Sequence, residues 1–152
     1  MLQTRIYSKK DLLQVLGIVG QVTESWGAGW KELIIEMFTT GKRCPFKIER
    51  FVAVERGEIV GLLVLKKEIL ATVIYFLAAK PGRRGEGIGS ELLKKAEEFA
   101  KGSGSSFLRV DVYDGFERNK KFYIKNGFKA SGHVRNYYEF GDSQAFFYKR
   151  IR

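Results

Sequence analysis

The sequence predicts a mixed α/β fold, and three observations lead to that prediction. Strand-like and helix-like hydrophobic patterns follow one another in the order β-α-α-β-β-β-α-β-α-β-β. Hairpin patterns before and after a single β-α-β stretch exclude a sheet whose strands are all parallel. A chain of 152 residues, 45% of them hydrophobic, is long enough to bury a core as one domain. We therefore expect one domain over residues 1–152, with a mixed, mostly antiparallel sheet of about seven strands and about four helices.

The first part of the chain is expected to form a strand, Leu2–Tyr7, and then two helices. Ser8 can cap the first helix, and Asp11 three residues later makes a partial capping box. The second helical pattern lies within Trp26–Phe38. Apolar residues recur at helical spacing in both: Leu12, Val15, Leu16, Val19 and Val22 in the first, and Trp30, Leu33, Ile34, Met37 and Phe38 in the second.

The middle of the chain is expected to form a hairpin, a buried strand and an amphipathic helix. The hairpin pairs Phe51–Val54 with Ile59–Leu65, and Gly61 marks a bulge in its second strand. Ile69–Ala79 is almost wholly apolar, as a central strand should be. The helical pattern then starts at Ile88 and continues to Ala100, with the expected end at Gly102. The remaining elements are a strand at Phe107–Tyr113, a helix at Glu117–Asn126, and a hairpin of His133–Phe140 with Gln144–Ile151.

The composition limits the classes of function. A net charge of +10, from 27 basic and 17 acidic residues, makes a polyanionic partner plausible: a nucleic acid, a phosphorylated cofactor or an acidic protein surface. Mere solubility explains the charge about equally well, because the basic residues are scattered. The single cysteine, Cys44, excludes an internal disulfide and fits a reducing cytoplasm. No apolar run approaches the length of about 20 residues that a membrane-spanning helix needs.

A glycine-rich basic turn between the buried strand and its helix is the most informative stretch. It contains Arg84, Gly85, Glu86, Gly87, Ile88 and Gly89. Glycines allow backbone N–H groups to turn outward, and a helix N-terminus adds partial positive charge, so the turn predicts an anion site, most naturally for phosphate. A dinucleotide-binding motif would need a glycine where Ser90 stands, and the P-loop sequence is absent. A connection that binds nothing is the remaining alternative for this stretch taken alone.

Two motifs together resemble the GNAT superfamily of N-acetyltransferases. Arg84 to Gly89 is similar to the R/Q-x-x-G-x-G/A motif of that family, and Phe122 to Phe128 is similar to its F-Y-x-x-x-G-F signature. The element order fits as well, so the resemblance covers nearly the whole chain. It implies a GNAT-like fold, acetyl-CoA as cofactor and an amine as acceptor. A primary amine of a protein N-terminus, a lysine or a small molecule would then attack the thioester directly.

The resemblance also implies roles for main-chain groups. The backbone of Arg84 to Gly89 would hold the pyrophosphate of the coenzyme. Main-chain groups of the strand that precedes the turn would align the pantetheine arm and could stabilise the oxyanion; by motif position these residues are Leu77, Ala78 and Ala79. Arg83 and Arg84 would add positive charge, although either side chain alone could equally be a solvated surface arginine.

Proton transfer needs an acid and a base. The tyrosine of the family signature protonates the departing thiolate, which implies Tyr123 as general acid; without the resemblance it would be a core residue. Asp111 lies where some members carry a glutamate base, and it would act through water. An ion pair with Arg109 on the same strand face explains Asp111 equally well. Glu68 is a weaker second candidate for the base.

Other features leave questions open. The family often has an asparagine where this chain has Phe116, and Asn119, one helical turn before Tyr123, could contact the coenzyme instead. His133 is the only histidine and predicts no metal site.

A non-catalytic basic module for nucleic acid or an acidic partner is the alternative function, supported by the aromatic and basic residues near the C-terminus. Glu24, Glu32, Glu36 and Glu139 could attract a cationic amine, and the final strands could build a homodimer.

Overall fold

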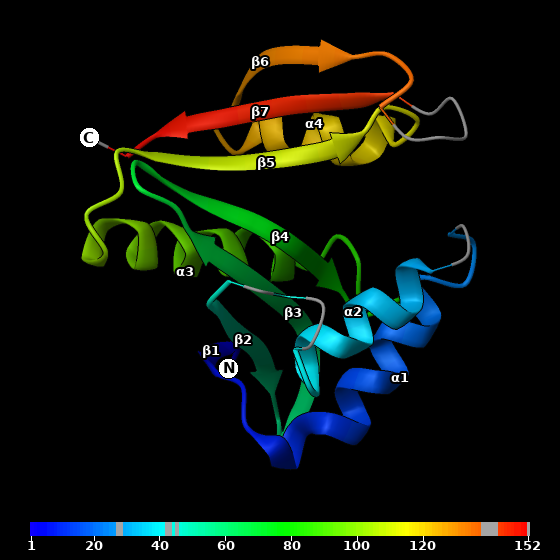
Figure 1. The fold of residues 1–152 in the computed structure, drawn as a ribbon. Coiled ribbons are helices and arrows are strands. Elements are labelled where there is room, and N and C mark those ends of the chain that lie inside the picture. The colour runs from blue at the N-terminus through cyan, green and yellow to red at the C-terminus, as the bar shows by residue number, and fades with distance from the viewer. Residues whose placement is uncertain (27–28, 42–43, 45, 138–142, 152) are drawn as a thin grey trace. The chain divides into compact units, whose positions relative to one another are not determined.

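The computed structural model describes residues 1–26, 29–41, 44, 46–137 and 143–151. Within them the chain forms seven strands and four α-helices (Figure 1). The strands are β1 (Gln3–Ile6), β2 (Ile48–Glu55), β3 (Glu58–Lys67), β4 (Ala71–Ala79), β5 (Phe107–Tyr113), β6 (Lys129–Val134) and β7 (Gln144–Arg150). The helices are α1 (Leu12–Val22), α2 (Trp30–Phe38), α3 (Ile88–Gly102) and α4 (Glu117–Lys125).

The strands are hydrogen-bonded in the order β1-β2-β3-β4-β5-β7-β6. β1 with β2, β2 with β3, β5 with β7 and β6 with β7 are antiparallel pairs. β4 and β5 are parallel, with Ala71 opposite Phe107 and Ile74 opposite Val110. The sheet is therefore mixed and mostly antiparallel, which confirms the predicted fold class.

The chain divides into two compact units. Unit 1 comprises Met1–Lys66 and Phe76–Ala96, and unit 2 comprises Lys67–Tyr75 and Glu97–Arg152. The boundary falls within β4 and within α3, so both units draw on the β4-α3-β5 stretch.

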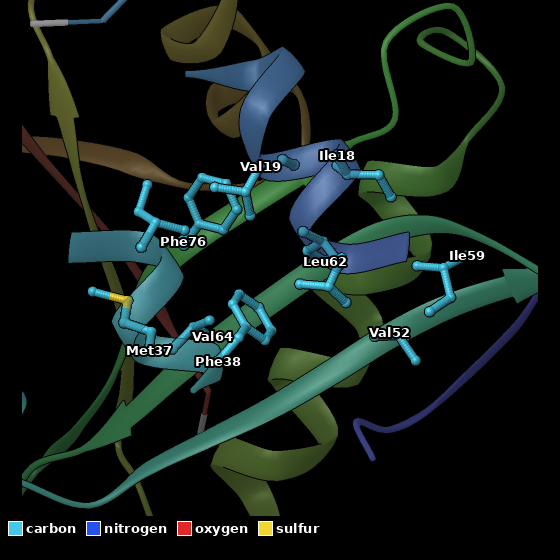
Figure 2. Packing of buried hydrophobic residues seen from close by; sticks show 12 residues of the cluster. Ile18, Val19, Met37, Phe38, Val52, Ile59, Leu62, Val64 and Phe76 are labelled. Carbon is cyan, nitrogen blue, oxygen red and sulfur yellow. The ribbon is translucent and has the colours of Figure 1, made fainter. Parts of the chain in front are cut away.

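Unit 1 buries one face of its strands under α1 and α2. Figure 2 shows side chains from both helices meeting side chains from β2, β3 and β4 in one apolar cluster. Burial of these groups stabilises this unit by roughly 25 cal/mol per Å² of apolar surface removed from water. The members of the cluster are Val15, Ile18, Val19, Ile34, Met37, Phe38, Val52, Ile59, Leu62, Val64, Phe76 and Ala78.

The predicted bulge in β3 is confirmed. Ala53 pairs with Gly61 but Val54 pairs with Ile59, so Val60 is the extra residue of the bulged strand. The Ser8 amide donates to Asp11 Oδ2 at 2.8 Å, as the sequence pattern predicts, but this bond closes a short 3-10 helix over Lys9–Asp11, and α1 itself begins after it, at Leu12.

Unit 2 packs α4 against the strands β5, β6 and β7. Alternate residues of β5 are buried, as its sequence predicts: Leu108, Val110 and Val112. Lys149 of β7 joins two other elements of the unit, because its Nζ lies 2.6 Å from Glu97 Oε1 and 3.0 Å from the Asn126 carbonyl oxygen. Aromatic side chains of β7 also meet neighbouring rings edge-on: Tyr148 meets Phe107 and Phe146 meets Tyr137, at centroid distances of 6.1 and 6.0 Å.

Several predicted boundaries differ from the structure. β2 begins at Ile48, three residues before the predicted start, and β3 ends at Lys67, two residues after the predicted end. Ile69 and Leu70 lie before β4, at 92% and 63% exposure, because the chain turns there between β3 and β4. The penultimate strand runs over Lys129–Val134 instead of starting at His133. The part of the predicted strand at 138–140 lies outside the described residues. No helix of the described ranges is long and apolar enough to cross a membrane.

Candidate active site

The turn between β4 and α3 has a backbone that only glycine adopts easily. Gly82, Gly85 and Gly87 have φ values of 87°, 82° and 81°, in the left-handed region that costs other residues about 1 kcal/mol or more. A Cβ built on any of the three would meet no atom within 4 Å, so the turn faces open space. The glycines are therefore required by backbone conformation, and room remains beside them for a ligand.

The amides at the start of α3 fit an anionic group. The Glu91 amide donates to the Gly87 carbonyl oxygen at 3.0 Å and so closes the first turn of the helix. The amides immediately before Glu91 have no acceptor within the helix, which is true of every helix N-terminus. Arg84, Gly85, Glu86 and Gly87 are exposed, whereas Ile88 is buried and fixes the helix to the core. These residues fit a diphosphate, because the site offers amide donors and the positive end of the helix dipole.

The two arginines of the turn differ in their contacts. Arg83 forms ion pairs with Glu55 and Glu86, the second at 2.7 Å between Nε and Oε2. The Arg84 side chain is exposed and makes no hydrogen bond or ion pair to the described residues. The sequence alone does not distinguish Arg83 from Arg84, because Glu55, which pairs with Arg83, is distant from it in the sequence.

The end of β4 lies next to α1 and α2 in unit 1. Ala78 is buried in their cluster, and the ring of Phe76 meets the ring of Trp26 edge-on at a centroid distance of 6.1 Å. The Lys80 amide donates to the Val60 carbonyl oxygen at 2.8 Å, which holds the last part of β4 against β3. The ladder between β4 and β5 ends at Ile74, before Leu77–Ala79 is reached.

A cavity of about 520 Å³ opens in unit 1 between the end of α1 and the start of α2. Glu24 and Glu32, two of the predicted acidic residues, line it together with Trp26. Glu36 does not line this cavity, and Glu139 lies outside the described residues. Among the described residues, the lining is Gly20, Gln21, Thr23, Glu24, Trp26, Gly29, Lys31 and Glu32.

Tyr123 lies on α4 in unit 2 and is buried, with 6% of its surface exposed. The rings of Phe122 and Phe128 meet its ring edge-on at centroid distances of 5.1 and 5.3 Å. Burial raises the pKa of Tyr123 well above the usual value of a phenol, because a phenolate is poorly solvated there. The hydroxyl is therefore protonated at neutral pH.

Asp111 lies on β5 in unit 2, beside Arg109. Burial raises the pKa of Asp111, Arg109 lowers it, and Glu68 raises it further. Arg109 Nε is 3.6 Å from Asp111 Oδ1, an ion pair too long for a hydrogen bond, and both atoms are buried without a hydrogen-bond partner in the described residues. Arg109 Nη1 also lies 3.5 Å from Glu68 Oε2. The ion pair expected from the sequence is present, and Asp111 is nevertheless more basic than an ordinary aspartate.

The other unit 2 residues considered from the sequence are exposed or half-buried. Asn119 on α4 is exposed, although Tyr123 one turn later is buried. Phe116 packs its ring edge-on against Tyr113 at 4.9 Å. His133 Nε2 lies 2.8 Å from Asp114 Oδ2, and no group of three or more potential metal ligands occurs in the part of the chain that the structure describes.

Fold and turn together define a class of protein: a mixed α/β protein with a glycine-rich turn immediately before the N-terminus of a helix. Residues 19–128 match the model of the acetyltransferase (GNAT) family. The chain belongs to the GNAT family and is an acetyltransferase. A comparison with curated proteins finds no match.

Solved structures with this fold include several acetyltransferases. An N-acetyltransferase from Staphylococcus aureus superposes with a TM-score of 0.80 at 22% identity, over 100% of this chain and 99% of that chain. The ribosomal-protein-S18-alanine N-acetyltransferase from Escherichia coli gives 0.74 at 16% identity, over 99% and 94%. A streptothricin acetyltransferase from Bacillus anthracis, solved with acetyl coenzyme A, gives 0.65 at 22% identity, over 68% and 62%. At these identities the likeness shows the fold alone.

Proposed function

We propose that residues 1–152 act as one acetyl-CoA-dependent N-acetyltransferase domain, which transfers an acetyl group to a primary amine in a ternary complex. The observation that carries the proposal is the turn before α3, where left-handed Gly85 and Gly87 leave open space beside the first amides of the helix. Such a turn suits a diphosphate, and the family to which the chain belongs uses acetyl-CoA.

Unit 1 would hold the coenzyme. The amides of Arg84 to Gly89 would bind the diphosphate, and the exposed Arg84 side chain would add charge. Main-chain groups of Leu77, Ala78 and Ala79 would align the pantetheine arm, because the ladder between β4 and β5 ends before them. Acetyl-CoA supplies, when bound, an acetyl group activated as a thioester.

Unit 2 would supply the proton transfers. The amine must lose a proton to become a nucleophile, and the departing thiolate must gain one. Asp111, whose pKa burial raises, would accept the first proton through water. Tyr123, held neutral by burial, would donate the second. Asn119 is exposed on the same helix and would contact the coenzyme in place of the missing family asparagine.

The acceptor amine would enter the cavity between α1 and α2. The contact of Trp26 with Phe76 joins this cavity to β4, next to Leu77. Among the described lining residues, Glu24 and Glu32 give the cavity two carboxylates against the one ammonium of Lys31, which favours an amine that is cationic before it reacts. A protein N-terminus, a lysine side chain and a small polyamine all meet this requirement.

The test is a binding and transfer experiment on the purified chain. Saturating acetyl-CoA is expected to raise the melting temperature by about 5–10 °C, the shift expected at roughly 100 times the dissociation constant for a chain of this length. Transfer to a panel of amines, followed by release of the CoA thiol, then identifies the acceptor. Absence of any thermal shift, together with absence of thiol release across the panel, would show the proposal to be wrong.

A further inference from the structure

Two ion pairs connect the glycine-rich turn between β4 and α3, residues 80–87, to the hairpin between β2 and β3. Glu55 is the last residue of β2 and pairs with Arg83 Nη2; Glu58 is the first residue of β3 and pairs with Lys80 Nζ. The carboxylates therefore come from the two sides of one tight hairpin turn. All four residues belong to unit 1.

Arg83 has its charge fully matched within the protein. Its guanidinium contacts two carboxylates, those of Glu55 and Glu86, so the three side chains together carry one negative charge. The Arg83 and Glu55 side chains are only 29% and 31% exposed, which limits screening of their ion pair by solvent. A group with net negative charge does not attract a diphosphate. The neighbouring Arg84, without such partners, is the side chain available for that role.

The turn needs to be held in place. Gly82, Gly85 and Gly87 lie in the left-handed region, and glycine loses more conformational freedom on ordering than any other residue. A turn that is already ordered before the ligand arrives binds more tightly, because that entropy is not lost on binding. Arg83 lies within the turn and is tied both to Glu55 outside it and to Glu86 inside it.

We propose that Arg83 is a positioning residue, which acts through Glu55 and Glu86 to keep the turn in its coenzyme-binding conformation. This inference rests on the proposed function, since it assumes that the turn binds the diphosphate of acetyl-CoA. Arg83 itself does not contact the diphosphate. The two arginines that are adjacent in the sequence thus have different tasks.

The variant Glu55→Gln separates positioning from direct contact, because the two roles predict effects of opposite sign. If Arg83 contacted the diphosphate, removal of a nearby negative charge would leave CoA binding unchanged or make it tighter. If Arg83 positions the turn, Glu55→Gln weakens CoA binding by about three- to fivefold, as expected for loss of one partly shielded ion pair. Arg83→Lys keeps the charge but cannot bridge two carboxylates in the same way, and should weaken binding similarly.

The experiment measures CoA affinity by titration calorimetry and, without any ligand, hydrogen exchange of the amides of residues 82–87. Glu49→Gln is the matched control, because Glu49 lies on β2 and its ion pair in the described part of the chain is with the exposed Lys47. Weaker binding and faster exchange of the turn in Glu55→Gln and Arg83→Lys, with wild-type behaviour of Glu49→Gln, support the inference. Unchanged or tighter binding in Glu55→Gln overturns it. If the wild type itself does not bind CoA, the proposed function fails, whereas the exchange data still show whether Arg83 holds the turn.

Discussion

Gly61 of β3 lies directly beneath Ile88, the first residue of α3. A Cβ added to Gly61 would lie 2.6 Å from Cγ2 of Ile88 and 3.0 Å from Cδ1 of Leu92. The first distance is shorter than carbon–carbon contacts allow and the second is tighter than most, so the helix approaches the strand this closely because residue 61 is glycine. The contact sets the position of the helix N-terminus, and with it the amides of the proposed diphosphate site.

We therefore expect Gly61→Ala to displace the start of α3. Overpacking of this kind costs typically about 1–3 kcal/mol of unfolding free energy. CoA binding should weaken in the same variant, since the amides at Ile88 and Gly89 move with the helix. Urea unfolding and calorimetric titration measure the two effects.

Gly17→Ala is the control for that experiment. Gly17 lies within α1, is exposed, and has no atom within 4 Å of a built Cβ. Alanine there should stabilise the protein by about 0.5–1 kcal/mol, because it has the better helix propensity. Equal effects of the two substitutions would contradict the role given to the Gly61–Ile88 contact.

Much of the fold could be predicted because it is encoded locally. The sequence pattern located the four α-helices and six of the seven strands in the described residues, and the φ values of Gly85 and Gly87 confirm that the glycines of the turn serve its backbone. The predicted ends of strands were wrong where tertiary contacts, and not the local sequence pattern, determine where a strand begins or ends. Apolar Ile69 lies in an exposed turn, where its carbonyl oxygen accepts from Lys67 Nζ at 3.1 Å, and β6 has no alternating pattern because all its residues are exposed.

The candidate site likewise has features that could be predicted from the sequence and features that could not. Its glycine turn and tyrosine signature are continuous in sequence and could be recognised there. The different tasks of Arg83 and Arg84 could not, because they depend on Glu55, which is brought to the turn by the hairpin. The burial that raises the pKa of Asp111 is likewise a tertiary effect. The roles of Tyr123, Asp111 and Asn119 remain predictions.

Tyr123→Phe is expected to lower kcat by about 100-fold or more, the usual contribution of a general acid, with little change in the affinity for acetyl-CoA. Phenylalanine keeps the ring packing with Phe122 and Phe128, so the fold should be preserved. In the wild type, burial raises the pKa of Tyr123, so loss of this acid should not limit kcat below about pH 10. Steady-state kinetics across pH test both points, and an unchanged kcat in the variant would remove Tyr123 from the mechanism.

Asp111→Asn should lower activity and raise stability. Burial raises the pKa of Asp111 in the folded state, so ionised Asp111 destabilises the native protein at pH values above that pKa. The neutral amide avoids this cost, and we expect a gain of a few tenths to about 1 kcal/mol near pH 7, which shrinks as the pH falls and Asp111 itself becomes protonated. Chemical unfolding at several pH values measures it.

Asp114→Asn is the matched control for Asp111→Asn. Lys120 and His133 bond to Asp114 and lower its pKa, so its charge stabilises the folded state above the ordinary aspartate pKa and that contribution is lost as the pH falls. The same substitution should therefore destabilise the protein at neutral pH. A loss of stability in Asp111→Asn as well would show that its ion pair with Arg109 outweighs burial.

The cavity between α1 and α2 allows a direct test of acceptor preference. Both tryptophans of the chain lie at this cavity or beside it: Trp26 lines it, and its ring meets that of Trp30 at a centroid distance of 6.4 Å. Binding of an amine there should change tryptophan fluorescence.

The double variant Glu24→Gln, Glu32→Gln should raise KM for a dicationic amine by about tenfold, the loss expected for two partly exposed charge contacts, with little change for acetyl-CoA. Glu91→Gln, on α3 outside the cavity lining, is the control. An equal rise in KM for neutral and cationic acceptors would show that the carboxylates do not select the acceptor by charge.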